Sequence, residues 1–192
     1  MIGQDLPVVR VGSEINCIFN AEIAEIFAED AEMEFLAGKF IGYHEAMDWK
    51  ENLLTTDAEI DELLRSVKRI AVLGIKPESH SGQPAYYVPK YMQNAGFEII
   101  PVPVYYPEVN EIMGEKVYRR LSEVPGEVDM LNVFRRSQDV SQHVEAVLEK
   151  KPKSVWLQLG IWNDDAAEAW AKAGIKVVQN LCLMVEHRAL LR

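Results

Sequence analysis

Several side chains that can bind an anion lie between residues 74 and 85. Lys76 supplies a positive charge, the hydroxyls of Ser79 and Ser81 can donate hydrogen bonds, and Gln83 supplies an amide. Pro84 suits the first turn of a helix, because its missing N–H would be unpaired there anyway. The free N–H groups of that turn and the positive end of the helix dipole would then point at the loop. The spacing predicts an anion site, with an ordinary capped turn as the alternative.

Three further predicted strand ends carry groups that suit a nucleotide-like ligand. Prolines and aromatic residues at positions 101–106 form a dry surface on which an adenine can pack. Phe134, Arg135 and Arg136 follow the next strand, and arginine forks match phosphate oxygens. We expect one arginine to contact the ligand and the other to form a surface ion pair. Gln158 and Gly160 end a further strand, where a glycine lets a ligand approach the backbone. Together these residues suit a ligand with an adenine, several phosphates and a long neutral arm.

The chain lacks the sequence patterns of the commonest nucleotide sites. A dinucleotide fingerprint needs three closely spaced glycines after the first strand, and only Gly74 and Gly82 are available. An NAD site also needs an acid at the end of the second strand, and none precedes Glu108. There is no Walker A motif, the histidines lack metal-ligand spacing, and spacing alone assembles no catalytic set. We therefore expect no metal ligands and no catalytic residues.

Strand and helix patterns alternate from residue 68 onward. Short apolar runs predict strands at residues 70–73, 97–104, 129–134, 154–159 and 176–178. Helical patterns follow at residues 85–95, 140–149, 164–173 and 183–190. Such alternation indicates an α/β fold, a parallel sheet of about five strands with helices on both faces. Ligands in this architecture bind beyond the carboxyl ends of the strands, near the switch in strand order.

The first third of the chain is acidic and has a helical pattern. Residues 1–66 hold 15 Asp and Glu against 4 Lys and Arg, whereas residues 67–192 hold 15 against 16. Apolar residues recur at helical spacing from Ile15 to Phe27, and Thr56 with Glu59 marks a later helix start. We expect an acidic helical extension over residues 1–58, which forms a homodimer or holds a protein partner, and one domain over residues 59–192. The acidity argues against a nucleic-acid partner.

The sequence indicates a cytoplasmic protein. Its two cysteines, Cys17 and Cys182, are too few for a disulfide framework. No apolar run is long enough to span a membrane, and no signal peptide is evident at the N-terminus. We therefore expect no membrane contact.

A series of short motifs carries a family resemblance. In chain order they are IAVLG (70–74), PAYYVPKYM (84–92), GFEIIPVP (96–103), IMGEKVY (112–118), VDMLNVFRR (128–136), VWLQLGI (155–161) and NLCLMVEH (180–187). With this order and spacing, residues 59–192 resemble the small CoA-binding proteins related to the CoA-binding domain of the succinyl-CoA synthetase alpha subunit. The resemblance implies a Rossmann-like fold, with the ligand pyrophosphate at the loop before the Pro84 helix. It also implies adenine packing near residues 102–104 and the turn at Phe134 and Arg135. The family commonly has an arginine where this chain has Gln83.

We expect a protein that binds coenzyme A or an acyl-CoA and catalyses no reaction of its own. The expected ligand contacts are Gly74, Ile75, Lys76, Ser79, Ser81, Gln83, Pro84, Ala85, Val102, Pro103, Val104, Phe134, Arg135, Arg136, Gln158 and Gly160. Gln158 is expected either to line the pantetheine arm of CoA or to satisfy a backbone group. Two alternatives stay open: a CoA-linked redox or thiol–disulfide protein that uses Cys182, and an NAD-binding Rossmann protein. Cys182 can also be a packing residue.

Overall fold

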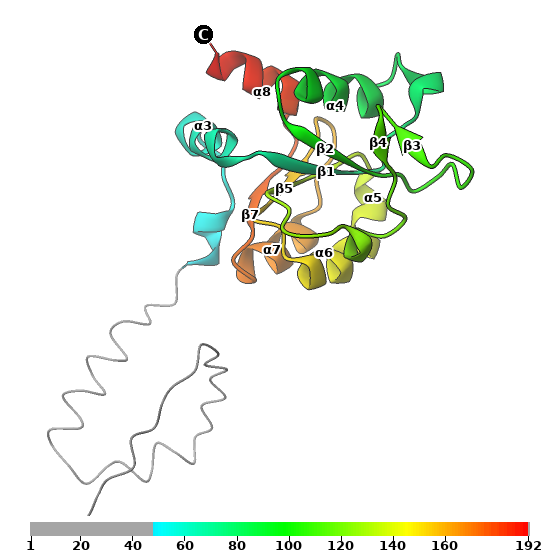
Figure 1. Cartoon of the computed structure of the whole chain (residues 1–192). Coiled ribbons are helices and arrows are strands. Elements are labelled where there is room, and N and C mark those ends of the chain that lie inside the picture. The colour runs from blue at the N-terminus through cyan, green and yellow to red at the C-terminus, as the bar shows by residue number, and fades with distance from the viewer. Residues whose placement is uncertain (1–47, 192) are drawn as a thin grey trace, which may run out of the picture. The chain divides into compact units, whose positions relative to one another are not determined.

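The computed structural model describes residues 48–191 (Figure 1). The helical patterns expected before residue 48 lie outside the described residues. The strands are β1 (Arg69–Leu73), β2 (Glu98–Val102), β3 (Glu111–Ile112), β4 (Glu115–Lys116), β5 (Met130–Val133), β6 (Ser154–Leu157) and β7 (Lys176–Val178). The α-helices are α3 (Asp57–Ser66), α4 (Pro84–Asn94), α5 (Ser137–Val140), α6 (Val144–Lys150), α7 (Asp164–Lys172) and α8 (Leu183–Leu190). Short 3-10 turns occupy Trp49–Asn52, Glu78–His80, Leu121–Glu123 and Ser141–His143.

Five parallel strands form the central sheet in the order β2-β1-β5-β6-β7. The chain starts at β1, moves outward to β2, and then returns to the other side of β1 to add β5. The strand order therefore reverses between β1 and β5, where the carboxyl ends of neighbouring strands diverge toward different loops. This arrangement confirms the Rossmann-like α/β fold with about five parallel strands.

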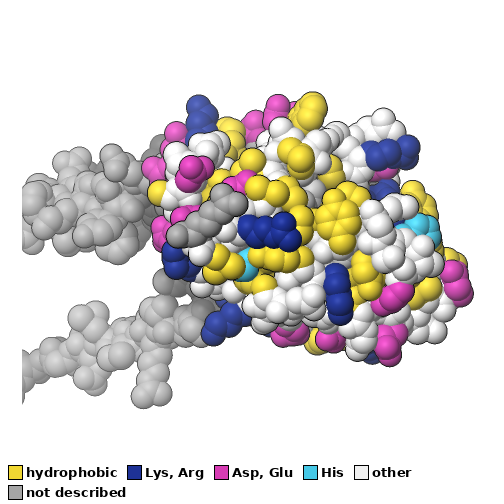
Figure 2. Space-filling model, turned by 90° about the horizontal axis from the view of Figure 1, so that it is seen from above, with side chains coloured by type: hydrophobic (Ala, Val, Ile, Leu, Met, Phe, Trp, Pro, Cys, Tyr) yellow, Lys and Arg dark blue, Asp and Glu magenta, His cyan; other side chains and the backbone are white. Residues whose placement is uncertain are grey.

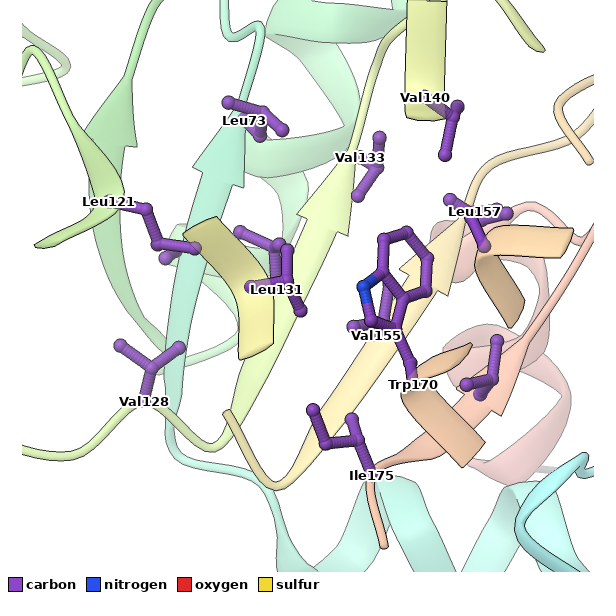
Figure 3. Packing of buried hydrophobic residues seen from close by; sticks show 14 of the residues in the cluster. Leu73, Leu121, Val128, Leu131, Val133, Val140, Val155, Leu157, Trp170 and Ile175 are labelled. Atoms are coloured by element: carbon purple, nitrogen blue, oxygen red, sulfur yellow. The ribbon is translucent and has the colours of Figure 1, made fainter. Parts of the chain in front are cut away.

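Helices cover both faces of the sheet (Figure 1). The face covered by α3, α4 and α8 buries Ile70, Val72 and Trp156. The opposite face, covered by α5, α6 and α7, buries Leu131 and Trp170. Figure 3 shows the indole of Trp170 lying over the strand residues of this second cluster. Successive residues of a strand point to opposite faces, so each strand contributes apolar side chains to both clusters.

Local sequence explains most element boundaries. The predicted helix start is confirmed, because the Oγ of Thr56 caps the N–H of Glu59 while the Glu59 carboxylate accepts from the N–H of Thr56 at 3.0 Å. Strand β2 ends at Val102 rather than at residue 104, because Pro103 has no N–H for the ladder. The helix predicted at residues 140–149 is divided into α5, a 3-10 turn and α6, since the N–H of Val144 bonds to the carbonyl of Ser141 in the tighter i to i+3 pattern.

Residues just before α3 are attached to the sheet. The Nδ2 of Asn52 donates to the carbonyl of Ala171 at 2.9 Å, and the N–H of Leu54 donates to the carbonyl of Val177 at 2.9 Å. This contact lies N-terminal to residue 59, where the sequence predicts the domain to begin. Over residues 48–191, no helix has the length and apolar character needed to cross a bilayer.

Candidate functional site

A pocket of about 450 Å³ opens at the carboxyl edge of the sheet, on the face covered by α4 and α8. Four segments meet in it: the loop after β1 with the start of α4, the turn after β5, the loop after β6, and the residue before α8. The predicted residues that line it are Lys76, Gln83, Pro84, Ala85, Phe134, Arg135, Arg136, Gln158, Gly160 and Cys182. Figure 2 views the α4 and α8 side, where hydrophobic side chains surround isolated basic ones. We call this pocket of about 450 Å³ the main pocket.

The loop after β1 brings one cation to the rim of the main pocket. The half-buried Lys76 is fixed by its N–H, which donates to the carbonyl of Ala85 at 3.1 Å. Its Nζ donates to the Oε1 of the exposed Gln83, the residue that precedes α4. Pro84 occupies the first turn of α4, and no side chain caps the helix start. The N-terminus of α4 therefore presents its positive end to the same rim as Lys76.

The predicted serines lie beside the main pocket rather than in its lining. Ser79 and Ser81 are exposed, and the Oγ of Ser79 lies 3.0 Å from the Nδ1 of His80. The other ring nitrogen of His80 lies 3.3 Å from the hydroxyl of Tyr106. Ile75 is 1% exposed and belongs to the hydrophobic core, so only its backbone can face a ligand.

Gly74 is required by its close approach to the neighbouring strand end. Its φ is +84°, and a Cβ atom built there would lie 2.5 Å from the carbonyl oxygen of Phe134. The N–H of Gly74 donates to the carbonyl of Val102, and the N–H of Phe134 donates to the carbonyl of Leu73. These contacts fix the end of β1 against the ends of β2 and β5, and Gly74 itself lies outside the lining of the main pocket.

The two arginines after β5 share one carboxylate. The Nε of Arg136 lies 2.9 Å from an oxygen of Asp139, and an amino group of Arg135 lies 3.4 Å from the same oxygen. The side chain of Arg135 is 10% exposed and that of Arg136 is 73% exposed. The hydrogen bond and charge of Asp139 raise the pKa of Arg136, so its guanidinium stays charged. Arg135 is thus the buried partner of Asp139, and Arg136 is the one that reaches solvent at the pocket rim.

The predicted adenine-packing residues lie in a second hollow, of about 440 Å³. Val102, Pro103 and Val104 line it together with residues of α6. Val102 is in register with Leu73 on the face covered by α6, whereas Phe134 packs with the cluster under α4. Residues 102–104 and the turn at Phe134 lie at the same edge of the sheet, as the sequence predicts. The structure puts them on opposite faces of the sheet.

His143 contributes a buried polar atom to this second hollow. Its Nε2 has no hydrogen-bond partner among residues 48–191. Burial lowers the pKa of the His143 imidazole, and the nearby Arg135 guanidinium lowers it further. The ring is therefore held neutral and does not act as a cation toward a phosphate.

A buried amide pair and a thiol complete the main pocket. The Nε2 of Gln158 donates to the Oδ1 of Asn132 at 2.8 Å. Cys182, the residue before α8, is half-buried and its thiol is free. The N–H of Gly160 donates to the Oδ1 of Asn180 at 2.7 Å, which holds the loop after β6 in place.

Sequence reasoning missed several residues in and behind the main pocket. Tyr87 and Val88 line it because they lie one turn beyond Pro84 on α4, and helical spacing could have identified them. Asn132, which bonds to Gln158 but does not line the pocket, was also missed, although a polar residue within an otherwise apolar strand is a usable signal. Asp139 gave no such signal, because only the folded chain brings it under both arginines. Across the described range, no group of three or more His, Cys, Asp or Glu side chains could hold a metal ion.

Comparison with known families explains this arrangement. Residues 68–188, more than half of the chain, match the family described as the CoA binding domain. The chain belongs to this CoA-binding family. The match runs from the residue before β1 into α8 and so includes every segment that lines the main pocket.

Relatives of this CoA-binding domain are similar over nearly their whole length. The YneT protein of Bacillus subtilis is 38% identical over 130 residues, which are 68% of this chain and 93% of that protein. A solved structure from Thermus thermophilus is 38% identical with a TM-score of 0.65, covering 71% of this chain and 99% of the other. A Pyrococcus horikoshii structure is 30% identical with a TM-score of 0.64, covering 72% and 94%. These likenesses confirm the Rossmann-like fold.

Proposed function

We propose that the protein binds coenzyme A or an acyl-CoA in the main pocket and catalyses no reaction of its own. The observation that carries the proposal is the convergence of Lys76, Arg136 and the uncapped start of α4 on one rim of a pocket in a CoA-binding domain. Two cations and a helix N-terminus together suit a pyrophosphate, because each of them attracts negative charge.

The proposal assigns each part of the ligand to a different wall. The pyrophosphate lies at Lys76 and the start of α4, with Arg136 at the outer rim. The adenine packs against Val102, Pro103 and Val104 in the second hollow, so the ligand crosses the sheet edge above Gly74. The pantetheine arm enters the main pocket toward Gln158. Ser79 and Ser81 lie outside the lining of the main pocket, so the proposal gives them no phosphate contact.

Calorimetric titration of the whole chain tests this function. CoA and acetyl-CoA are expected to give binding heat, whereas NAD and ATP are expected to bind much more weakly. Lys76→Met removes one cation from the rim and is expected to weaken CoA binding about 10-fold. Lys116→Met, which removes an exposed lysine from β4, serves as the matched control. Heat with NAD and none with any CoA species would refute the assignment.

A second candidate function follows from the position of Cys182 in the wall of the same pocket. Its thiolate can attack one sulfur of CoA disulfide, which breaks the S–S bond, forms a mixed disulfide with Cys182 and releases CoA thiolate. Treatment with CoA disulfide followed by intact-mass measurement tests the exchange. No adduct of CoA mass, or an equal adduct on the Cys182→Ser variant, argues against it.

We also propose that the protein acts in the cytoplasm and that residues before the described part serve in assembly. Truncation should remove residues 1–47 and keep Asn52 and Leu54, because these two residues bond to α7 and β7. Retained CoA binding with a smaller assembly in light scattering supports the assembly role. An unchanged assembly size contradicts it.

A further inference from the structure

Two amide side chains are buried together behind the wall of the main pocket. Asn132 is fully buried in the centre of the sheet, in register with Val72 on one side and Trp156 on the other. Gln158 is 4% exposed and follows β6 directly, two residues beyond Trp156 and on the same face. Polar side chains in such a position are costly unless they are hydrogen-bonded, so the pair calls for an explanation.

The hydrogen bond between them determines which atom Gln158 offers to the pocket. Its Nε2 donates to the Oδ1 of Asn132 at 2.8 Å. This leaves the Oε1 of Gln158 as the acceptor that the side chain offers to the pocket it lines, beside the second N–H of its Nε2. An amide oxygen accepts hydrogen bonds and donates none. The buried site thus presents an acceptor that requires an N–H or O–H from whatever fills the pocket.

The two segments that carry Gln158 and Cys182 contribute no charged side chain to the lining of the main pocket. They contribute Gln158, Leu159, Gly160 and Ile161 from the loop after β6, and Cys182 before α8. The cations of the main pocket come from other segments, the loop after β1 and the turn after β5. The amide oxygen of Gln158 suits a neutral ligand group with an N–H and not an anion, since an amide oxygen repels negative charge.

We propose that the Oε1 of Gln158 accepts a hydrogen bond from a secondary amide N–H of the pantetheine arm, and that Asn132 is the positioning residue that fixes the orientation of the Gln158 amide. The inference rests on the proposed CoA binding and adds the contact that recognises the arm. Asn132 has a spare donor, because its Nδ2 is buried without a partner among the described residues. If the residue at position 158 can only accept, the Asn132 amide can turn over and donate from this Nδ2, so the pair stays bonded.

The experiment compares two ligands on the full chain: CoA, and 3′-phosphoadenosine 5′-diphosphate, which is CoA without the arm. The ratio of the affinity for CoA to the affinity for the armless ligand isolates the contribution of the arm from that of the phosphates. Wild type is expected to bind CoA more tightly. Gln158→Met keeps the length of the side chain but removes the acceptor, so the ratio should fall about 2- to 10-fold, the value of one neutral hydrogen bond. The affinity for the armless ligand should not change.

A second variant separates an acceptor from a donor. Gln158→Glu presents an oxygen to the ligand, and its other oxygen can accept from the Nδ2 of Asn132 after the Asn132 amide turns over. The ratio should then stay within about 2-fold of wild type, because any repulsion of phosphates affects both ligands. If the wild-type pair were oriented the other way, with a Gln158 N–H facing the ligand, the glutamate would lower the ratio as methionine does.

Further variants test the role of Asn132. Asn132→Leu should lower the ratio, and the double variant with Gln158→Met should lower it no further than Gln158→Met alone, because Asn132 acts through Gln158. Gln179→Met is the matched control, since the Oε1 of Gln179 accepts from the N–H of Asn163 and lies outside the pocket lining. Circular dichroism confirms that each variant is folded.

The outcomes are distinguishable. An unchanged ratio in Gln158→Met, or a ratio lowered by Gln158→Glu, overturns the inference. Equal wild-type affinities for the two ligands show that the arm lies elsewhere, which overturns the inference and leaves CoA binding intact. If neither ligand binds, the proposed function and the inference both fall.

Discussion

Replacing Gln83 with arginine tests whether the ligand phosphates lie at the start of α4. Gln83 is exposed, precedes Pro84 and accepts a hydrogen bond from the Nζ of Lys76. The substitution restores the charge that the family commonly has before this proline and adds a second cation beside Lys76. Because the new guanidinium stands at the uncapped end of α4, it acts on the same anion as Lys76 and the helix dipole.

The size of the effect follows from Coulomb's law. Two unit charges about 4 Å apart interact by about 1 kcal/mol in water and by about 4 kcal/mol at an effective dielectric constant of 20. The exposure of Gln83 favours the lower value. A pyrophosphate carries two negative charges, so the gain is about 1–2 kcal/mol, or about 5- to 30-fold in affinity. Repulsion between the guanidinium and Lys76 acts with and without ligand and therefore lowers the free energy of unfolding rather than the affinity.

Calorimetric titration with CoA at low and high salt is the assay. We expect tighter binding of the Gln83→Arg variant and a steeper loss of its affinity with salt, since exposed charges are screened. Asn94→Arg is the matched control: it adds the same charge at the other end of α4, about 15 Å away by helical rise. Unchanged or weaker CoA binding of Gln83→Arg would show that the phosphates do not lie at this loop, and equal tightening by Asn94→Arg would attribute the effect to net charge.

Three further predictions concern the same structure. Arg136→Gln should weaken CoA binding about 3- to 10-fold in calorimetry, because a charge-assisted contact at the rim is lost, and an unchanged affinity would remove Arg136 from the site. Gly74→Ala should lower the free energy of unfolding by about 2 kcal/mol or more in urea titration, whereas Gly96→Ala, with a similar positive φ but open space around it, should cost about 1 kcal/mol. Burial lowers the pKa of His187, so the unfolded chain takes up a proton more readily and stability should fall as pH drops below about 6.5. His187→Phe should reduce that pH dependence, and an unaltered pH profile of urea unfolding would contradict this account.

Local physical chemistry accounts for how much of the fold the sequence predicts. Short apolar runs predict all five strands of the parallel sheet, and β7 and α8 have the predicted bounds. A helix start is encoded within four residues by the capping box at Thr56 and Glu59. The boundaries that differ, such as the ends of β2 and the divided helix before α6, depend on hydrogen bonds that a local pattern does not specify.

The candidate site is predicted less completely, because side-chain partners come from distant segments. Lys76 and Gln83 were both identified as candidates, yet their mutual hydrogen bond requires the loop to fold back on the start of α4. The two arginines were expected to divide their roles, but the structure ties both to Asp139 and distinguishes them by burial. The role of Gln158 depends on Asn132, which is 26 residues away.

The class of fold, the order of its elements and the edge of the sheet that carries the candidate site can be predicted from the sequence alone. These follow from hydrophobic periodicity and from the ends of parallel strands, which all meet at one edge. The face of the sheet on which each residue lies depends on the folded chain. Val102 and Phe134 both follow apolar strand positions, but strand order and register point them to opposite faces. Val102 thus lies in the second hollow and Phe134 in the main pocket, because alternate residues of a strand face opposite ways.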